Sequence, residues 1–275
     1  MKILSTPHAH TTYCDGKNSA EEMVLTAIEK GFVSLGLSEH GEQSIDSGSS
    51  LKPHQVAPYI AEVRALQKKY ADTFRLHLGI ERDFYSLARR EDYDYVLASF
   101  HYMKKDGVLC AADGKPEPLH LFRDNQYDGD GAAMAVDFFI ESGKYCLDYK
   151  PEIFGHFDLI KKHNKQHELY DPADKRVIDA AFDSLDMILA SGALLEVNTG
   201  GMARSAQPFA YPDMIYLKRW HDIGGRIIVG SDCHYAPQLD YAFDEMPAYL
   251  REAGFTTAWR LGALGEDQFV EFELD

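Results

Sequence analysis

Seven short apolar runs alternate with amphipathic segments along most of the chain, and this alternation limits the folds it can adopt. The runs are mostly apolar throughout, as expected for parallel strands that are covered on both faces. We expect strands at Lys2–Pro7, Ser34–Ser38, Arg75–Ile80, Tyr95–Ser99, Glu152–Gly155, Ala193–Val197 and Arg226–Gly230. We expect helices at Ala20–Lys30, Ala57–Tyr70, Ala132–Tyr149, Ala173–Ser191, Met214–Ile223 and Pro237–Ala253.

The number of repeats and the chain length favour a closed α/β fold. Seven βα repeats within 275 residues predict a distorted TIM-like (β/α)7 barrel. An open, doubly wound sheet is the alternative. We expect a single domain over residues 1–275, because no convincing linker divides the chain. Gly31, Gly192 and Gly254 each follow an expected helix, at the position where glycine commonly ends one.

Two segments depart from the repeat. Lys104–Gly131 contains several Asp-Gly pairs and little apolar periodicity, so we expect it to be an excursion over the barrel mouth. Trp259–Leu274 is expected to form a short hairpin around Gly265. Both segments should therefore lie outside the seven repeats.

Side chains that can bind metal ions stand at the carboxyl ends of the expected strands. In a barrel these ends meet at one face, where the active site is normally built. Each residue alone has an ordinary explanation; Asp15, for example, stands in an Asp-Gly pair that is common in turns. Their shared placement is what favours one site. The residues are His8, His10, Asp15, His40, Glu81, His101, His156, Asp232 and His234.

The residue types at this rim narrow its chemistry. The sequences HAH at 8–10 and DCH at 232–234 have period-two spacing, so the outer side chains of each can point the same way. Cys233 should then face away, as a small core residue. Six histidines and three carboxylates offer nitrogen and oxygen ligands, which suits Zn, Mn or Fe. Nine ligands exceed the needs of one ion and suit two or three ions with a bridging carboxylate.

The charge of the chain argues against several kinds of partner. A formal net charge of −16 disfavours non-specific binding to nucleic acid or to a membrane. It would also repel a phosphorylated substrate unless bound cations reverse the local field. The four cysteines form no Cys-x-x-Cys pair, and no apolar run resembles a signal peptide or a membrane span. We therefore expect a cytoplasmic protein.

Seven motifs follow one another along the chain: HAHTTYCDG, SEH, GIE, ASFHY, GHFDL, EVNTGG and GSDCH. In this order they resemble the PHP (polymerase and histidinol phosphatase) superfamily over nearly the whole chain. The length, the long segment between ASFHY and GHFDL, and EVNTGG followed by Arg204 resemble its histidinol-phosphate phosphatase branch. The resemblance implies a distorted (β/α)7 barrel with three divalent metal ions and the active site at the C-terminal ends of the strands.

The resemblance also implies how the nine candidates would divide among the ions, with Glu81 as a bridge. The groups are His8, His10, Glu81 and Asp232 for the first ion, Glu81, His101 and His156 for the second, and Asp15, His40 and His234 for the third.

The implied reaction is hydrolysis of a small phosphate monoester, L-histidinol phosphate, to L-histidinol and phosphate in histidine biosynthesis. A metal-bridging hydroxide would attack phosphorus while the ions neutralise the phosphate oxygens. We expect Arg204 to clamp the phosphate, because a guanidinium can bind its oxygens in bidentate fashion. Lys161 or Lys162 would assist. Asp232, His234 or a metal-bound water would protonate the leaving alkoxide.

Other ionisable residues have less specific interpretations. Glu42, Asp113 and Asp158 are candidate acceptors for the ammonium or imidazole group of histidinol phosphate, although surface acid is their default explanation. His77 lies within an expected strand and is assigned to the core.

Three alternatives remain open at this point. The first is a related phosphoesterase that acts on another small phosphate or a nucleotide. The second is a non-catalytic metal-binding regulatory protein, and the third is a barrel isomerase or lyase with a single metal. The last would not need nine ligands. Proofreading of nucleic acid is disfavoured, because the chain shows no basic track.

Overall fold

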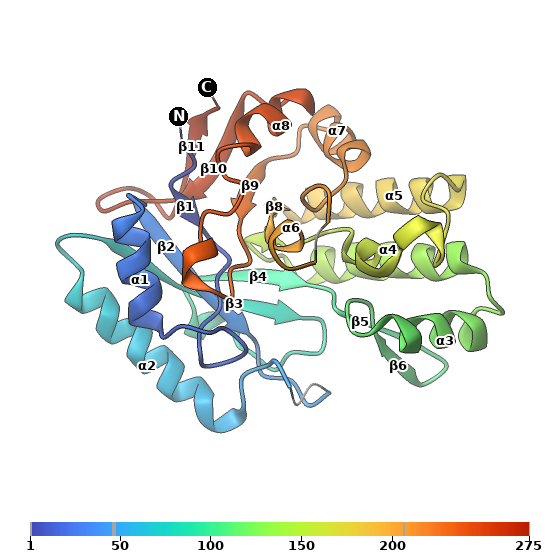
Figure 1. Ribbon diagram of the computed structural model, residues 1–275, viewed down its shortest axis with the longest axis horizontal. Helices are drawn as coiled ribbons and strands as arrows, with labels where there is room; N and C mark the ends of the chain where they lie inside the picture. The colour runs from blue at the N-terminus through green and yellow to red at the C-terminus, as the bar shows by residue number, and fades with distance from the viewer. Residues whose placement is uncertain (1, 46–47, 206, 275) are drawn as a thin grey trace.

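The protein is described by a computed structural model over residues 2–45, 48–205 and 207–274 (Figure 1). Its main sheet has nine strands in the order β1-β2-β3-β4-β7-β8-β9-β10-β11, and the first seven are parallel. Each of the seven expected strands is present. They are β1 (Ser5–Thr6), β2 (Ser34–His40), β3 (Arg75–Asp83), β4 (Tyr95–Ser99), β7 (Ile153–Phe154), β8 (Leu194–Asn198) and β9 (Ile227–Gly230).

The two ends of this seven-stranded array meet. An isolated parallel bridge joins Ala9, which follows β1, to Cys233, which follows β9. The backbone N–H of His10 donates to the carbonyl of Cys233 at 2.8 Å. The N–H of Ser231 donates to Thr6 Oγ1 at 3.0 Å. The parallel sheet thus curls back toward its first strand, in agreement with the expected distorted TIM-like fold.

Helices lie around the outside of the curled sheet (Figure 1). Helix α4 packs along α5, and α2 packs on β3. In the described part of the chain, no helix is both long enough and apolar enough to cross a lipid bilayer. The α-helices are α1 (Ala20–Glu29), α2 (Pro53–Lys69), α3 (Pro116–Gln126), α4 (Gly131–Tyr149), α5 (Lys175–Ser191), α6 (Gly200–Ser205), α7 (Met214–Asp222) and α8 (Met246–Glu252). Short 3₁₀ turns are η1 (Arg90–Asp92), η2 (Leu159–His163), η3 (Lys165–His167) and η4 (Ala236–Gln238).

The helix ends follow the local sequence. At the start of α1, the Ser19 side chain accepts from the N–H of Glu22, whose carboxylate accepts from the N–H of Ser19. The three glycines expected to stop helices, Gly31, Gly192 and Gly254, have φ of +77°, +86° and +107°. Because glycine adopts this left-handed conformation without a steric penalty, each one turns the chain out of its helix.

The helix expected at Pro237–Ala253 is wrong in extent. The structure has the 3₁₀ turn η4 and then α8, with Ala242 at a positive φ of 60° between them. Pro247 stands in the first turn of α8, where proline is favoured because its missing N–H has no intrahelical partner there. A proline at this position begins a new helix more readily than it continues one from residue 237.

The two departures from the repeat form hairpins. Strands β5 (Tyr102–Lys105) and β6 (Val108–Ala111) pair in antiparallel fashion and lead into α3, all inside the expected excursion. Strands β10 (Thr257–Leu261) and β11 (Phe269–Glu273) form the expected terminal hairpin. That hairpin also extends the main sheet, because β10 pairs in parallel with β9.

The sheet encloses an apolar cluster below its carboxyl ends. Gly79 faces this cluster, and a Cβ atom there would lie 2.3 Å from Cζ of Tyr95. Glycine at this position therefore leaves the space that the Tyr95 ring fills. The polar residues of the rim lie above this apolar layer. The cluster consists of Tyr95, Leu97, Ile153, Leu194, Ile228 and Leu261.

Candidate metal centre

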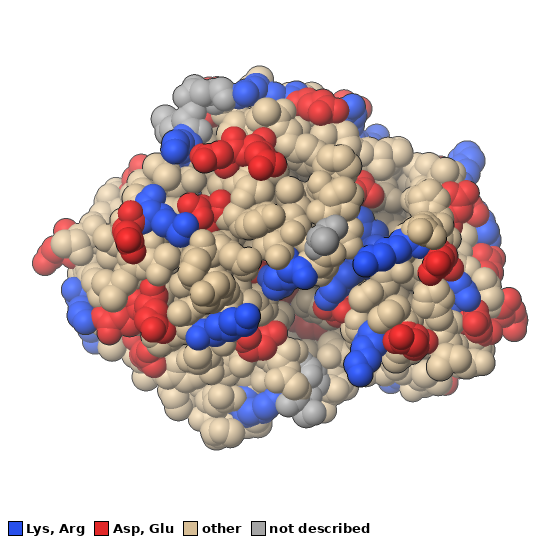
Figure 2. Space-filling model, viewed as in Figure 1, with Lys and Arg blue, Asp and Glu red and all other residues tan. Residues whose placement is uncertain are grey.

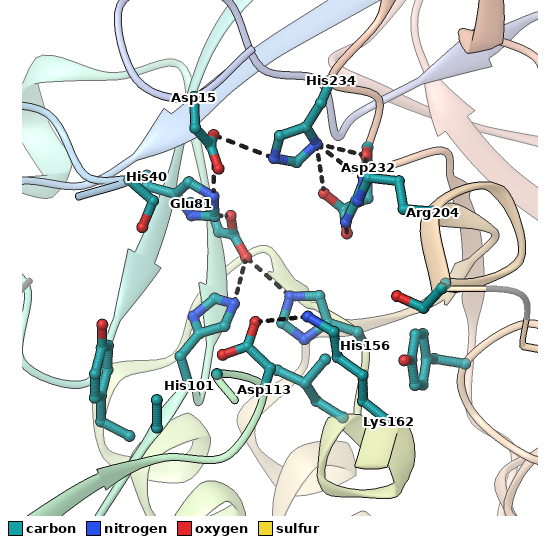
Figure 3. Close-up of a pocket in the computed structure, with 18 of the residues that line it drawn as sticks. Asp15, His40, Glu81, His101, Asp113, His156, Lys162, Arg204, Asp232 and His234 are labelled. Atoms are coloured by element: carbon teal, nitrogen blue, oxygen red, sulfur yellow. Dashed lines mark hydrogen bonds and ion pairs between the residues drawn. The ribbon is translucent and has the colours of Figure 1, made fainter. Parts of the chain in front are cut away.

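All nine residues that the sequence assigns to the rim come together at the carboxyl ends of the strands. Figure 3 shows the seven that line the cavity, Asp15, His40, Glu81, His101, His156, Asp232 and His234. Each belongs to at least one group of three or more side chains whose ligand atoms lie within 4.8 Å of one another. His40 ends β2 and Glu81 lies near the end of β3. The others stand on the loops that follow β1, β4, β7 and β9. The register of the parallel strands therefore positions the whole set.

Glu81 lies at the centre of the cluster. Its Oε2 is 2.7 Å from His40 Nδ1 and 3.2 Å from His8 Nε2. Its Oε1 is 2.9 Å from His156 Nε2 and 3.5 Å from His101 Nε2. Burial alone would raise the pKa of this carboxyl, but the surrounding histidines hold it well below its ordinary value. Glu81 is thus an ionised carboxylate with both oxygens directed at imidazole nitrogens.

Asp232 forms a second focus of the cluster. Its Oδ1 lies 3.3 Å from His10 Nε2 and 3.6 Å from His8 Nε2. Its Oδ2 pairs with Nη2 of Arg204 at 2.7 Å. The neighbouring Cys233 is 3 % exposed and belongs to the core, as its alternate position in the sequence predicts.

Asp15 and His234 form the third part of the cluster. Asp15 Oδ1 lies 3.1 Å from His234 Nε2 and 3.6 Å from His40 Nε2. His10 stands within reach of the same three side chains, so it adjoins two of the groups. Burial would raise the pKa of Asp15, but the three histidines lower it. Asp15 therefore faces the cluster, even though it stands in an Asp-Gly pair of the kind common in turns.

The buried atoms of this cluster fit divalent cations. Within the described residues, His8 Nε2 and His10 Nε2 are buried and make no hydrogen bond, although carboxylate oxygens lie 3.2 Å and 3.3 Å from them. Such atoms are costly unless a partner satisfies them. Burial, followed by the nearby imidazoles of His234 and His40, lowers the pKa of His10 well below its ordinary value. A neutral imidazole can donate its lone pair to a metal ion, so His10 suits one.

Two carboxylates that the sequence did not assign to the site hold the histidines from behind. Glu196 is fully buried, and its Oε1 lies 2.7 Å from His8 Nδ1. Its Oε2 accepts from the backbone N–H of His156 at 3.0 Å. Asp83 Oδ2 lies 3.3 Å from His101 Nδ1. A charged residue inside the apolar run LLEVN was the available signal for Glu196, because a buried carboxylate needs a partner.

A cavity of about 380 Å³ opens over the cluster. Arg204 and Lys162 line it, and Arg204 Nη1 lies 2.9 Å from His234 Nδ1. Figure 2 shows a hollow in this face with Lys and Arg side chains around it, although the chain as a whole is acidic. The cavity thus combines a cluster of possible metal ligands with two cationic side chains.

Lys161 differs from its neighbour Lys162. Its Nζ lies 3.0 Å from Asp158 Oδ2 and 2.5 Å from Asp213 Oδ1, and it does not line the cavity. This placement disfavours Lys161 as a phosphate-binding residue. The 3₁₀ turn η2 explains the difference, because successive side chains of a helical turn point in different directions.

Comparison with known proteins places this fold and cluster in a family. Residues 7–200 match the PHP domain. A probable histidinol-phosphatase of Deinococcus radiodurans is 27% identical over 273 residues, covering 94% of this chain and 96% of that protein. The histidinol-phosphatase of Bacillus subtilis is 24% identical over 277 residues, covering 86% of this chain and 96% of that protein.

A solved structure shows the same fold. Histidinol phosphate phosphatase from Lactococcus lactis, crystallised with zinc, L-histidinol and phosphate, is 20% identical and has a TM-score of 0.65. The similarity covers 93% of this chain and 95% of that one. Because the PHP match spans most of the chain and includes β3 with Glu81 and the loops that carry His101 and His156, the chain belongs to the PHP domain family.

Proposed function

We propose that the protein is a metal-dependent phosphatase that hydrolyses L-histidinol phosphate to L-histidinol and phosphate in histidine biosynthesis. The observation that carries this proposal is the convergence of six histidines, Asp15 and Asp232 around Glu81, in a cluster that lies at one cavity and contributes seven of its lining residues. Relatives named as histidinol-phosphatases align over nearly their whole length and give the substrate its identity.

The proposed cofactors are three divalent ions, with Zn, Mn or Fe as candidates. The close approach of His8, His10 and Asp232 supports the first group of ligands. The contacts of Glu81 with His156 and His101 support the second. The third group is supported by the close approach of its ligand atoms, which lie within 4.8 Å of one another and of His10. Its members are Asp15, His40 and His234.

The ions, when bound, would lower the pKa of a water molecule and neutralise phosphate oxygens. Arg204 would bind the phosphate from the side of Asp232, and Lys162 from the opposite loop. Burial raises the pKa of Asp232, but Arg204 and His8 lower it well below its ordinary value. Asp232 would then stay ionised and hold Arg204. Because His234 Nδ1 accepts from Arg204 and its Nε2 faces Asp15 in the third group of ligands, a metal-bound water would protonate the leaving alkoxide.

The whole chain is proposed to act as one phosphoesterase domain. Asp232 and His234 lie beyond the part that matches the PHP domain, yet they complete the cluster because β9 pairs with β8. A cytoplasmic location, expected from the sequence, is part of the same proposal.

Phosphate release from a panel of phosphomonoesters tests the function. The purified, metal-loaded protein should turn over L-histidinol phosphate with a higher kcat/KM than nucleoside monophosphates or sugar phosphates. Preference for a nucleotide would retain the chemistry and overturn the substrate. Absence of turnover on every phosphomonoester, with metal bound, would favour a regulatory metal-binding protein instead.

A further inference from the structure

Asp113 reaches the catalytic cavity from the segment that interrupts the βα repeat. It stands in the turn between β6 and α3 and lines the same cavity as Glu81 and Arg204. Figure 3 shows Asp113 near His101 and Lys162, whereas Arg204 lies beside Asp232 and His234. The cavity therefore has a carboxylate away from the guanidinium that would bind phosphate.

Among the described residues that line the cavity, Asp113 is the one carboxylate outside the proposed ligand set. The side chain of Asp113 is 30% exposed, and its Oδ2 lies 3.2 Å from Nζ of Lys162. Glu42 and Asp158, the other acids considered from the sequence, do not line the cavity. Asp158 is fully buried and pairs with Lys161 at 3.0 Å. Of the three candidate acceptors, Asp113 is therefore the one that lines the cavity.

We propose that Asp113 determines substrate specificity by binding the ammonium group of L-histidinol phosphate, an inference that rests on the proposed function. Metal ions and Arg204 would recognise the phosphate, which all phosphomonoesters share. The ammonium group distinguishes this substrate, and a partly buried carboxylate binds such a cation strongly. In the structure this carboxylate pairs with Lys162 Nζ at 3.2 Å, so its geometry suits an alkylammonium group. When Lys162 turns to the phosphate, the ammonium group of the substrate would take its place on Asp113. Gln43 also lines the cavity, but its neutral amide would not select a cation in the same way.

Steady-state kinetics on two matched substrates test this role. L-Histidinol phosphate is compared with 3-(imidazol-4-yl)propyl phosphate, which lacks only the ammonium group. Asp113→Asn should lower kcat/KM for L-histidinol phosphate about 10- to 100-fold, mainly through KM, because a charged hydrogen bond is lost. The same variant should leave kcat/KM for the deaminated analogue within about threefold of wild type.

Asp106→Asn is the matched control. Asp106 lies in the exposed turn of the β5–β6 hairpin at a positive φ of 48°, a conformation that asparagine also tolerates. Asp106→Asn removes one negative charge from the hairpin that precedes Asp113, outside the cavity lining, so both substrates should react as with wild type. Metal content is measured for every variant and should not change.

Equal losses on both substrates would overturn the inference, since Asp113 would then act through Lys162 or through the metal centre. No loss on either substrate would overturn it as well. If Asp113→Asn does not fold, inhibition of the wild type decides. L-Histidinol should inhibit at lower concentration than 3-(imidazol-4-yl)propan-1-ol, and equal inhibition contradicts the proposal. Failure of the wild type to hydrolyse L-histidinol phosphate would instead refute the proposed function, and this inference with it.

Discussion

His8 and His77 are both buried histidines on the inner side of the sheet, yet their surroundings differ. His77, four residues before Glu81 on β3, donates from Nε2 to the carbonyl of Gly262 at 2.9 Å. Burial lowers the pKa of His77 to about 4. His8 at the rim faces Glu196 and Glu81, which raise its pKa well above the ordinary value although burial lowers it.

The difference teaches that the partners of a buried histidine, and not its burial, indicate its role. His77 has a backbone acceptor and lies beneath the apolar layer, where the protein satisfies its own polar groups. His8 Nε2 makes no hydrogen bond among the described residues and points at carboxylates that also face other imidazoles. The rim therefore needs a cation that the lower interior does not need.

The largest effect is expected at the centre of the rim. Glu81→Gln keeps the size of the side chain and removes the charge that the histidines surround. Phosphatase activity should fall by at least about 10²- to 10³-fold, with loss of bound metal measured by mass spectrometry of the purified protein. Glu117→Gln, on the exposed face of α3, is the control. Full activity with full metal content in Glu81→Gln would remove the distinction between rim and lower interior.

A smaller effect is expected behind the rim. Glu196→Gln weakens the acceptor for His8 Nδ1 and changes no residue that lines the cavity. Glutamine keeps the size of the side chain, which matters because Glu196 packs tightly against Gly230. A Cβ atom at Gly230 would lie 1.9 Å from Glu196 Oε1. Metal affinity should fall about 10- to 100-fold, as for other carboxylates that orient a ligating histidine.

A titration of activity against added metal measures the effect of Glu196→Gln. High metal concentration should restore turnover, because the cavity itself is intact. Activity that stays low at saturating metal, with the fold retained by circular dichroism, would show that Glu196 does not act by positioning His8.

The smallest effect on function is expected at His77. His77→Leu leaves the Gly262 carbonyl without its donor, so the free energy of unfolding in urea should fall by about 1–3 kcal/mol. Metal content and kcat/KM should equal those of wild type. Metal loss in His77→Leu would contradict the distinction between His77 and His8, because it would show that metal binding at the rim depends on the lower interior.

Much of this arrangement was predictable from residue order alone. All nine rim residues follow or end an apolar run, and the parallel register then brings them to one end of the sheet. His77 was assigned to the core because it stands inside its run, and it is 2% exposed. The position of a residue within or after its apolar run therefore predicts whether its side chain lies in the core or at the rim, because the direction of each strand determines which side chains meet.

Other features depended on long-range contacts that the sequence does not express. Lys161 and Lys162 are adjacent and chemically identical, and only the turn η2 sends one to Asp158 and the other to the cavity. Glu196 acquires its role from His8, which is 188 residues away along the chain. The side on which Asp113 approaches the cavity depends on the β5–β6 hairpin, whose sequence lacks the periodicity of the repeats.

The central claim is that ions bind at the rim and not in the lower interior. Anomalous diffraction from crystals grown with zinc or manganese, collected on either side of the metal absorption edge, tests it directly. The account predicts three peaks among the nine rim side chains, with Glu81 between two of them, and none beside His77. Fewer than two peaks at the rim, or a peak at His77, would contradict it.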